Sequence, residues 1–223
     1  MGTVILIRHA CSVANADNVL AGQTPGVQLD QVGVEQSRAL VDTLGEIPIT
    51  KVFVSPLERC LQTISPWLAK HGRGVEVQSE ARIIEPDYGL WSGRKLDELA
   101  HEPLWQDVQN DPESVTFPQG ERFIDVWNRV SSFYQSLKEI SSADTTFLII
   151  SHGDIIKFLL ANVLKIEFKN FQSLVVEPAS ISVAHIDKTI ERLIQFNRSQ
   201  ESISSILRDR TAPTLGGENS VRT

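Results

Sequence analysis

Four short apolar runs along the chain are typical of buried strands. β-Branched residues dominate them, and polar or turn residues bound each one. Their apolar character is continuous rather than alternating, which favours a parallel sheet covered on both faces. The runs are Val4–Ile7, Val52–Val54, Val75–Val77, with Arg82–Ile84 as a candidate continuation, and Phe147–Ile150.

Helical periodicity fills the intervals between these runs. It covers Val34–Leu44, Leu57–Ala69, Phe123–Leu137 and Ile155–Leu164. Strands that alternate with helices predict an α/β fold, here a three-layer αβα sandwich with a mostly parallel central sheet. Near the end, Ser180–His185 and Glu191–Phe196 predict a closing hairpin or two further edge strands.

The stretch from about residue 86 to residue 120 differs in texture from the rest. It carries Tyr88, Trp91, Trp105 and Phe117 among prolines, glycines and charges. We interpret it as a small cap inserted over one end of the sheet; the alternative is a helical surface excursion with its own small core. From about residue 199 the chain turns rich in Ser, Arg, Thr and Gly, which predicts a flexible tail (199–223) after a domain spanning residues 1–198.

The composition fits one domain and narrows its partners. A chain of 223 residues with 41% hydrophobic residues can build a full core. Acidic residues outnumber basic ones, 28 to 21, and the net charge of −7 disfavours nucleic acid or an anionic membrane as a partner. A chain of this charge that binds a small anion must gather cations locally. The sequence leaves the oligomeric state open, and a homodimer is one of the alternatives.

The cysteines point to a reducing compartment. Cys11 and Cys60 are the only two, without metal-type or redox-type spacing, so we expect inert thiols in a cytoplasmic protein. The run Val4–Ile7 is too short for the apolar segment of a signal peptide. Nowhere does the sequence hold about 18 uninterrupted apolar residues, so we expect no membrane span.

Polar residues with a capacity for anion chemistry follow each predicted strand. In an open α/β sheet the ligand crevice lies outside the carboxyl ends of the strands. Each feature alone is common; Ser-Pro-Leu at residue 55, for example, usually starts a helix with Ser as the N-cap. Together they predict one pocket that gathers two arginines, two histidines and one glutamate, namely Arg8, His9, Arg59, Glu85 and His152.

The ordered set of motifs resembles the histidine phosphatase superfamily, in its phosphoglycerate-mutase-like branch. Residues 8–15 (RHACSVAN) resemble R-H-G-x-S-x-x-N, and residues 29–36 resemble L-T-x-x-G-x-x-Q. Residues 55–63 (SPLERCLQT) resemble S-P-L-x-R-x-x-x-T, and residues 85–93 (EPDYGLWSG) resemble E-x-x-x-G-x-W-x-G. Residues 118–121 echo P-x-G-E, and residues 151–153 (SHG) complete a resemblance that runs from about residue 3 to residue 197.

The resemblance implies a role for each matching residue. His9 would be the nucleophile that becomes phosphohistidine, and Glu85 would protonate the leaving oxygen and then deprotonate water. Two guanidiniums and a protonated second histidine would stabilise the transferring phosphoryl group, so neither a metal nor another cofactor is implied. The residues that would hold the phosphate oxygens are Arg8, Asn15, Arg59 and His152.

Three positions depart from the family pattern, namely Ala10, Ala21 and Cys11, which replaces a common acid. Ala10 replaces a glycine beside the nucleophile, which is tolerable only if its φ is negative. Ala21 stands, by count from His9, where relatives often carry a polar phosphate contact, and the segment Gly22-Gln23 is a candidate to replace that contact. In the cap, Tyr88 and Arg94 are further candidates for contact with the substrate.

The cap favours hydrolysis of a small phosphorylated metabolite over a mutase reaction. Cofactor-dependent phosphoglycerate mutases carry a longer and more basic insertion, whereas Arg94-Lys95 is the only clustered basic pair here. We therefore expect a phosphomonoesterase, with a phosphomutase as the alternative and a non-catalytic phosphometabolite sensor as a third reading. A metal phosphatase is disfavoured because no ligand cluster has suitable spacing. A cysteine phosphatase is disfavoured because Asp17 and Pro66, rather than arginines, stand six residues after the cysteines.

Overall fold

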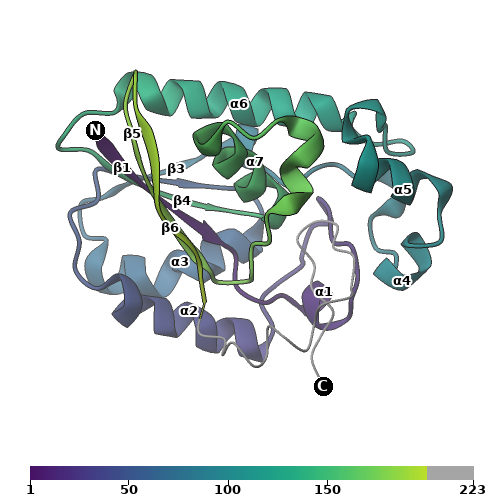
Figure 1. Ribbon diagram of the computed structural model, residues 1–223. Helices are drawn as coiled ribbons and strands as arrows, with labels where there is room; N and C mark the ends of the chain where they lie inside the picture. Colours follow the sequence, from purple (N-terminus) through teal and green to yellow (C-terminus); the bar gives the residue numbers. More distant parts are fainter. Residues whose placement is uncertain (200–223) are drawn as a thin grey trace.

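The computed structural model of the chain describes residues 1–199, so most of the predicted tail lies outside the described residues (Figure 1). Its centre is a six-stranded sheet with the order β3-β2-β4-β1-β5-β6. The neighbours β3, β2, β4 and β1 pair in parallel, and β5 and β6 pair antiparallel, as the predicted closing hairpin. The strands are β1 (Gly2–Arg8), β2 (Lys51–Val54), β3 (Glu76–Ser79), β4 (Thr146–Ser151), β5 (Ile181–Ile186) and β6 (Glu191–Arg198).

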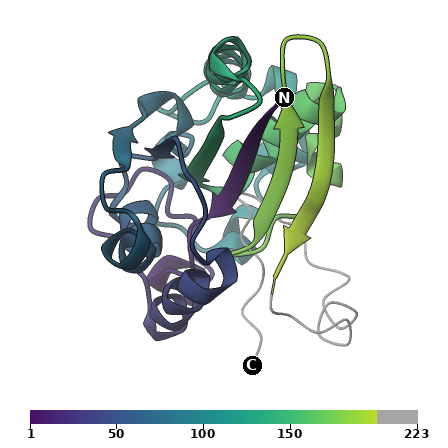
Figure 2. The same ribbon diagram turned by 90° about the vertical axis from the view of Figure 1, so that its left-hand side faces the viewer.

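Helices cover both faces of this sheet (Figures 1 and 2). Alternate residues of each central strand point to opposite faces, so a strand with an apolar run feeds two cores at once. Leu148 and Ile150 of β4 join the cluster under α2 (Gln31–Leu44) and α3 (Glu58–His71). Phe147 and Ile149 join the cluster under α6 (Phe123–Ile140) and α7 (Gly153–Leu164). The three-layer αβα sandwich predicted from the sequence is therefore confirmed.

One predicted strand is shorter and more exposed than its pattern indicated. β3 pairs only with β2 and is mostly exposed, so it is an edge strand rather than a buried one. The candidate continuation through Arg82–Ile84 is wrong, because Ala81–Ile83 forms a 3₁₀ turn (η1). The ladder ends when Glu80 N donates to Val54 O, at the last residue of β2, and the Glu80 side chain then caps the turn at Arg82 N.

The start of α2 fixes the segment that follows β1. Asp30 caps the helix by accepting from Gly33 N, and Gln36 Oε1 accepts from Cys11 N at 2.8 Å. A Cβ on Gly33 would lie 1.9 Å from Cys11 O, so only glycine permits this approach. The spacing of Asp30, Gly33 and Gln36 thus holds the chain just beyond the end of β1.

The stretch from residue 86 to residue 120 folds over one end of the sheet (Figure 1). It contains η2 (Gly89–Trp91), α4 (Leu96–Leu99), α5 (Pro103–Asn110) and η3 (Pro112–Ser114). Its aromatic side chains belong to the same buried cluster as α6 and α7, with Trp91 stacked on Trp105. Within residues 1–199, no helix has the length and apolar character needed to cross a membrane.

The two ends of this cap are joined by backbone. Glu121 N donates to Asp87 O and Leu90 N donates to Pro118 O, both at 2.8 Å. A Cβ on Gly120 would lie 2.3 Å from Asp87 O, and a Cβ on Gly89, whose φ is +53°, would lie 2.1 Å from Pro118 O. The main chains of the two cap ends therefore touch directly. We call residues 87–90 and 118–121 the cap stem.

Candidate active site

The five residues predicted to form one pocket do converge at the carboxyl ends of the parallel strands. Arg8 ends β1 and His9 follows it, while His152 links β4 to α7. Arg59 lies in the first turn of α3, and Glu85 follows η1. All five side chains are buried. Segments that span most of the chain thus meet at one place.

His9 is set up as a neutral nucleophile. Its Nδ1 lies 2.8 Å from Ala10 O, which can only accept, so Nδ1 carries the proton and Nε2 carries the lone pair. Burial, followed by the charges of Arg59 and Arg8, lowers the pKa of His9 well below 6.5. Ala10 is not among the residues with positive φ, so alanine is tolerated there as predicted. Ala10 N also donates to Thr63 Oγ1.

Arg59 is the hub of the site. Its Nε donates to His9 Nε2 at 3.3 Å, and its Nη2 donates to Gly22 O at 2.9 Å. The same Nη2 lies 3.2 Å from His152 Nδ1 and 3.7 Å from Glu85 Oε2. Within residues 1–199, Nη1 is buried and has no hydrogen-bond partner. A rigid guanidinium therefore orients three functional groups and keeps one donor available for an oxyanion.

Ser55 supports the second histidine instead of capping a helix. The N-cap of α3 is Leu57, which makes no side-chain capping bond, so the expectation of a Ser55 N-cap is wrong. Ser55 Oγ lies 2.7 Å from His152 Nε2. This contact fixes the plane of the imidazole ring.

The surroundings of His152 lower its pKa in this structure, and the expectation that it is protonated around a bound phosphate stays a prediction. Burial is the first cause of its lowered pKa, followed by the charges of Arg59, His9, Arg8 and Arg129. The cations gathered for a phosphate also repel a proton, and a bound phosphate dianion would oppose that effect. The sequence could not show this balance, because it depends on distances between remote residues.

Glu85 and His152 share a proton position. Glu85 Oε2 lies 3.1 Å from His152 Nδ1, and a contact this short between two acceptors needs a proton between them. Either group can carry that proton, because Ser55 Oγ can donate to His152 Nε2 or accept from it. The contact therefore gives Glu85 a buried neighbour with which it can exchange a proton, as a general acid requires.

Hydrogen bonds fix the side chains of Arg8 and Asn15. Arg8 Nη1 donates to Val176 O at 2.8 Å. Asn15 lies on the short helix α1 (Val13–Ala16), where its Oδ1 accepts from Ser12 N and from Ser12 Oγ, both at 2.9 Å. These bonds fix the orientation of the Asn15 carboxamide. Its predicted contact with phosphate stays a prediction.

The four candidates for substrate contact lie in different settings. Gly22 O binds Arg59, and Gln23 Nε2 donates to Glu85 O at 2.8 Å, so both support the site. Tyr88 is buried, and its hydroxyl donates to Asp154 Oδ2 at 3.0 Å. Arg94 pairs with Glu102 at 2.6 Å. Contact of any of them with a substrate stays a prediction.

The two cysteines differ in burial. Burial raises the pKa of Cys60 to about 12, although its Sγ lies 3.5 Å from His152 Nε2, so this thiol is inert as predicted. Cys11 is only half-buried. Both are free thiols.

Three of these residues also have the makings of a metal site. His9, Glu85 and His152 each offer a ligand atom, and the three atoms lie within 4.8 Å of one another. Two imidazoles and a carboxylate match a zinc ligand set, and the sequence spacing had not revealed it. Arg59, however, contacts all three groups. Because these three side chains already contact a positively charged guanidinium, they fit an anion-binding site better than a metal site.

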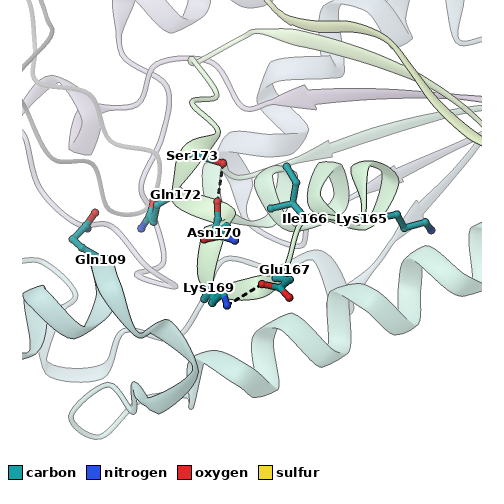
Figure 3. A pocket seen from close by; sticks show the side chains of 8 residues that line it. All are labelled: Gln109, Lys165, Ile166, Glu167, Lys169, Asn170, Gln172 and Ser173. Atoms are coloured by element: carbon teal, nitrogen blue, oxygen red, sulfur yellow. Dashed lines mark hydrogen bonds and ion pairs between the residues drawn. The ribbon is translucent and has the colours of Figure 1, made fainter.

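A hollow lies apart from this group, beside the segment that follows α7 (Figure 3). Its volume is about 590 Å³, and seven of its eight lining residues have polar side chains. Its two lysines are paired with acids, Lys165 with Glu191 at 2.7 Å and Lys169 with Glu167 at 3.0 Å. None of the catalytic candidates lines it. The lining residues are Gln109, Lys165, Ile166, Glu167, Lys169, Asn170, Gln172 and Ser173.

A nucleophilic imidazole, an acid and a cationic cradle at the carboxyl ends of a parallel sheet define a phosphoryl-transfer enzyme that works through histidine. The chain belongs to the histidine phosphatase superfamily (branch 1), whose family model matches residues 4–199.

Individual relatives include both phosphatases and a mutase-like protein. The chain is 28% identical over 203 residues to phosphoserine phosphatase 1 of Hydrogenobacter thermophilus, covering 88% of this chain and 92% of that one. It is 28% identical over 200 residues to phosphoglycerate mutase-like protein AT74 of Arabidopsis thaliana, covering 77% and 60%. The crystal structure of the alpha-ribazole phosphatase from Shigella flexneri superimposes with a TM-score of 0.78 at 25% identity, covering 90% and 100%.

Proposed function

We propose that the chain is a metal-independent phosphomonoesterase that hydrolyses a small phosphorylated metabolite through a phosphohistidine on His9. One observation carries this proposal. The neutral Nε2 of His9 meets the Arg59 guanidinium, and the same guanidinium contacts the Glu85–His152 pair that holds the proton. Nucleophile, charge stabilisation and acid are thus fixed by one side chain.

The geometry supports a two-step reaction. His9 Nε2 attacks phosphorus, the bond to the ester oxygen breaks, and the Glu85 carboxyl gives its proton to the departing alcohol. Glu85, now a carboxylate, takes a proton from water as that water attacks phosphorus. The P–N bond breaks, and phosphate and neutral His9 are released. Arg8 and Arg59 stabilise charge on the phosphoryl oxygens in both steps.

The cap supports hydrolysis over mutase activity. A mutase must bind the carboxylate or second phosphate of its substrate, and so it needs spare cations in the cap. Here Arg94 pairs with Glu102, and Lys95 Nζ donates to Asp17 O at 2.7 Å. Relatives named as phosphatases agree with this choice. A phosphomutase is the second candidate, favoured by a relative named as mutase-like.

The free thiols support a reducing, cytoplasmic setting. The substrate class, a small phosphomonoester, follows from the buried site. A phosphoserine substrate is one member of that class, suggested by a relative's name.

The decisive experiment is a phosphometabolite panel in which phosphate release and mutase activity are measured side by side, with and without bisphosphoglycerate. We expect phosphate release that is unaffected by chelators. Isomerised product that depends on bisphosphoglycerate would favour the mutase. Loss of turnover on chelation, restored by added metal, would overturn metal independence. Binding of phosphate with no turnover of any ester would favour a sensor.

A further inference from the structure

The segment that carries Glu85 is held by side chains instead of by a sheet. β3 ends at Ser79, and η1 takes the chain away from β2. Even so, each of the four consecutive carbonyls of residues 82–85 accepts a hydrogen bond from a side chain. Ser151 Oγ donates to Ile83 O at 2.7 Å, and Gln23 Nε2 donates to Glu85 O at 2.8 Å.

The remaining carbonyls are held by one residue of α6. Arg129 Nη1 donates to Arg82 O and to Ile84 O, both at 2.8 Å, and Arg129 Nη2 donates to Glu85 O at 3.3 Å. A planar guanidinium can reach three carbonyls at once because its donors diverge at fixed angles. These contacts were not predictable from the sequence, because Arg129 lies in an ordinary amphipathic helix.

Glu121 completes the clamp. Its carboxylate accepts from Arg129 Nε and Nη2, both at 3.2 Å. Glu121 Oε2 also accepts from Asp87 N at 2.8 Å, two residues beyond Glu85. The pair therefore grips the chain on both sides of the acid. Both side chains are only partly exposed, Arg129 at 18% and Glu121 at 29%.

We propose that Arg129, oriented by Glu121, is a positioning residue that sets the Glu85 carboxyl for proton transfer to the leaving oxygen. It acts through the backbone of residues 82–87 and touches no reacting atom. The proposal rests on the proposed function, since it presumes that Glu85 is the acid. A misplacement of about 1 Å can cost on the order of 100-fold in rate, so a loosened segment should be visible kinetically.

Two variants separate positioning from charge. Arg129 contributes to the lowered pKa of His152, so its charge alone affects the site. Arg129→Lys keeps that charge but cannot reach three carbonyls and two carboxylate oxygens. Arg129→Met removes both the positive charge and the hydrogen bonds. Glu121→Gln keeps an acceptor for Asp87 N but weakens the hold on Arg129.

Lys138 offers a matched control. It lies on the same helix, its side chain is 15% exposed, and it pairs with Glu191 at 2.6 Å. Within residues 1–199 it contacts Glu191 and the Tyr134 ring, which both lie outside residues 82–87. Lys138→Met therefore removes a comparable ion pair from α6 without touching the acid's segment.

The test compares kcat/KM for p-nitrophenyl phosphate, whose leaving group needs no proton, with that for an alkyl ester, O-phosphoserine or glycerol 2-phosphate. Thermal unfolding of every variant gives the folded fraction. We expect Arg129→Lys and Arg129→Met to lose at least about 10-fold more activity on the alkyl ester than on the aryl ester. Glu121→Gln should shift the ratio in the same direction, and Lys138→Met should leave it unchanged.

Equal slowing of both esters in the Arg129 variants would overturn the positioning role, and so would a ratio equal to that of Lys138→Met. If only Arg129→Met shifted the ratio, the charge rather than the clamp would be responsible, which also overturns the proposal. Failure of the proposed function is distinct, because the wild-type protein would then hydrolyse neither ester.

Discussion

Replacing Arg59 with lysine tests the cationic cradle most directly. The change keeps a positive charge beside His9 and removes the planar fork. In the structure one guanidinium contacts His9 Nε2, Gly22 O and His152 Nδ1. A lysine ammonium has a single nitrogen, so it cannot keep these contacts and also face a phosphoryl oxygen.

The size of the effect follows from Nη1, a nitrogen of the Arg59 guanidinium. Arg59 Nη1 is buried and makes no hydrogen bond within residues 1–199, so we expect it to bind a phosphoryl oxygen. A hydrogen bond to a charged group contributes about 1.5–3 kcal/mol. Its loss should lower kcat/KM by roughly 10- to 150-fold, since each 1.36 kcal/mol is a factor of ten. Loss of the contact with His9 adds to this.

The assay is kcat/KM for p-nitrophenyl phosphate near neutral pH, with the folded fraction checked by thermal unfolding. Arg59→Met should lose more than Arg59→Lys, because it also removes the charge. Arg38→Lys is the matched control, since Arg38 is an exposed residue of α2 and is not among the site candidates. An Arg59→Lys enzyme within about threefold of the wild type would refute the reasoning.

Three further outcomes follow from the same geometry. His9→Ala should abolish phosphate release and acid-labile phosphate labelling while the protein still unfolds cooperatively; near-normal turnover would end the proposed mechanism. Glu85→Gln should slow alkyl esters more than p-nitrophenyl phosphate, because only the former need the proton, and equal slowing would remove Glu85 as the acid. Burial and the two arginines lower the pKa values of His9 and His152, so below about pH 6.5 the unfolded chain binds protons that the folded chain does not. The free energy of unfolding should therefore fall as the pH is lowered from about 7 to about 5, and it should fall less steeply in His9→Asn. Identical slopes in the wild type and this variant would contradict the assigned cause.

The strands of the central sheet were predictable because burial on both faces leaves a continuous apolar run. β1, β2 and β4 all show it, and the two-layer core explains why. The prediction failed at residues 82–84, where an apolar pair suggested a strand. There the neighbouring strand had already ended at Val54, a tertiary fact that local composition does not report.

The catalytic candidates were predictable because the carboxyl ends of parallel strands gather at one edge. Their supporting contacts were not. Arg129 reaches a segment 44 to 47 residues away, and Ser55 reaches His152 across 97 residues. The protonation of His152 depends on how closely Arg8 and Arg59 approach it. Such quantities exist only once the chain has folded.

The cap stem makes the position of the catalytic residues independent of the length of the inserted cap. Its two halves lie next to Glu85 and are joined by main-chain hydrogen bonds of 2.8 Å. Two of its glycines have no room for a side chain. The segment between the two halves of the stem, residues 91–117, can change in length or in side chains while the proton donor keeps its position. Selectivity for different substrates can therefore change through this segment alone, while the residues that carry out the reaction stay the same.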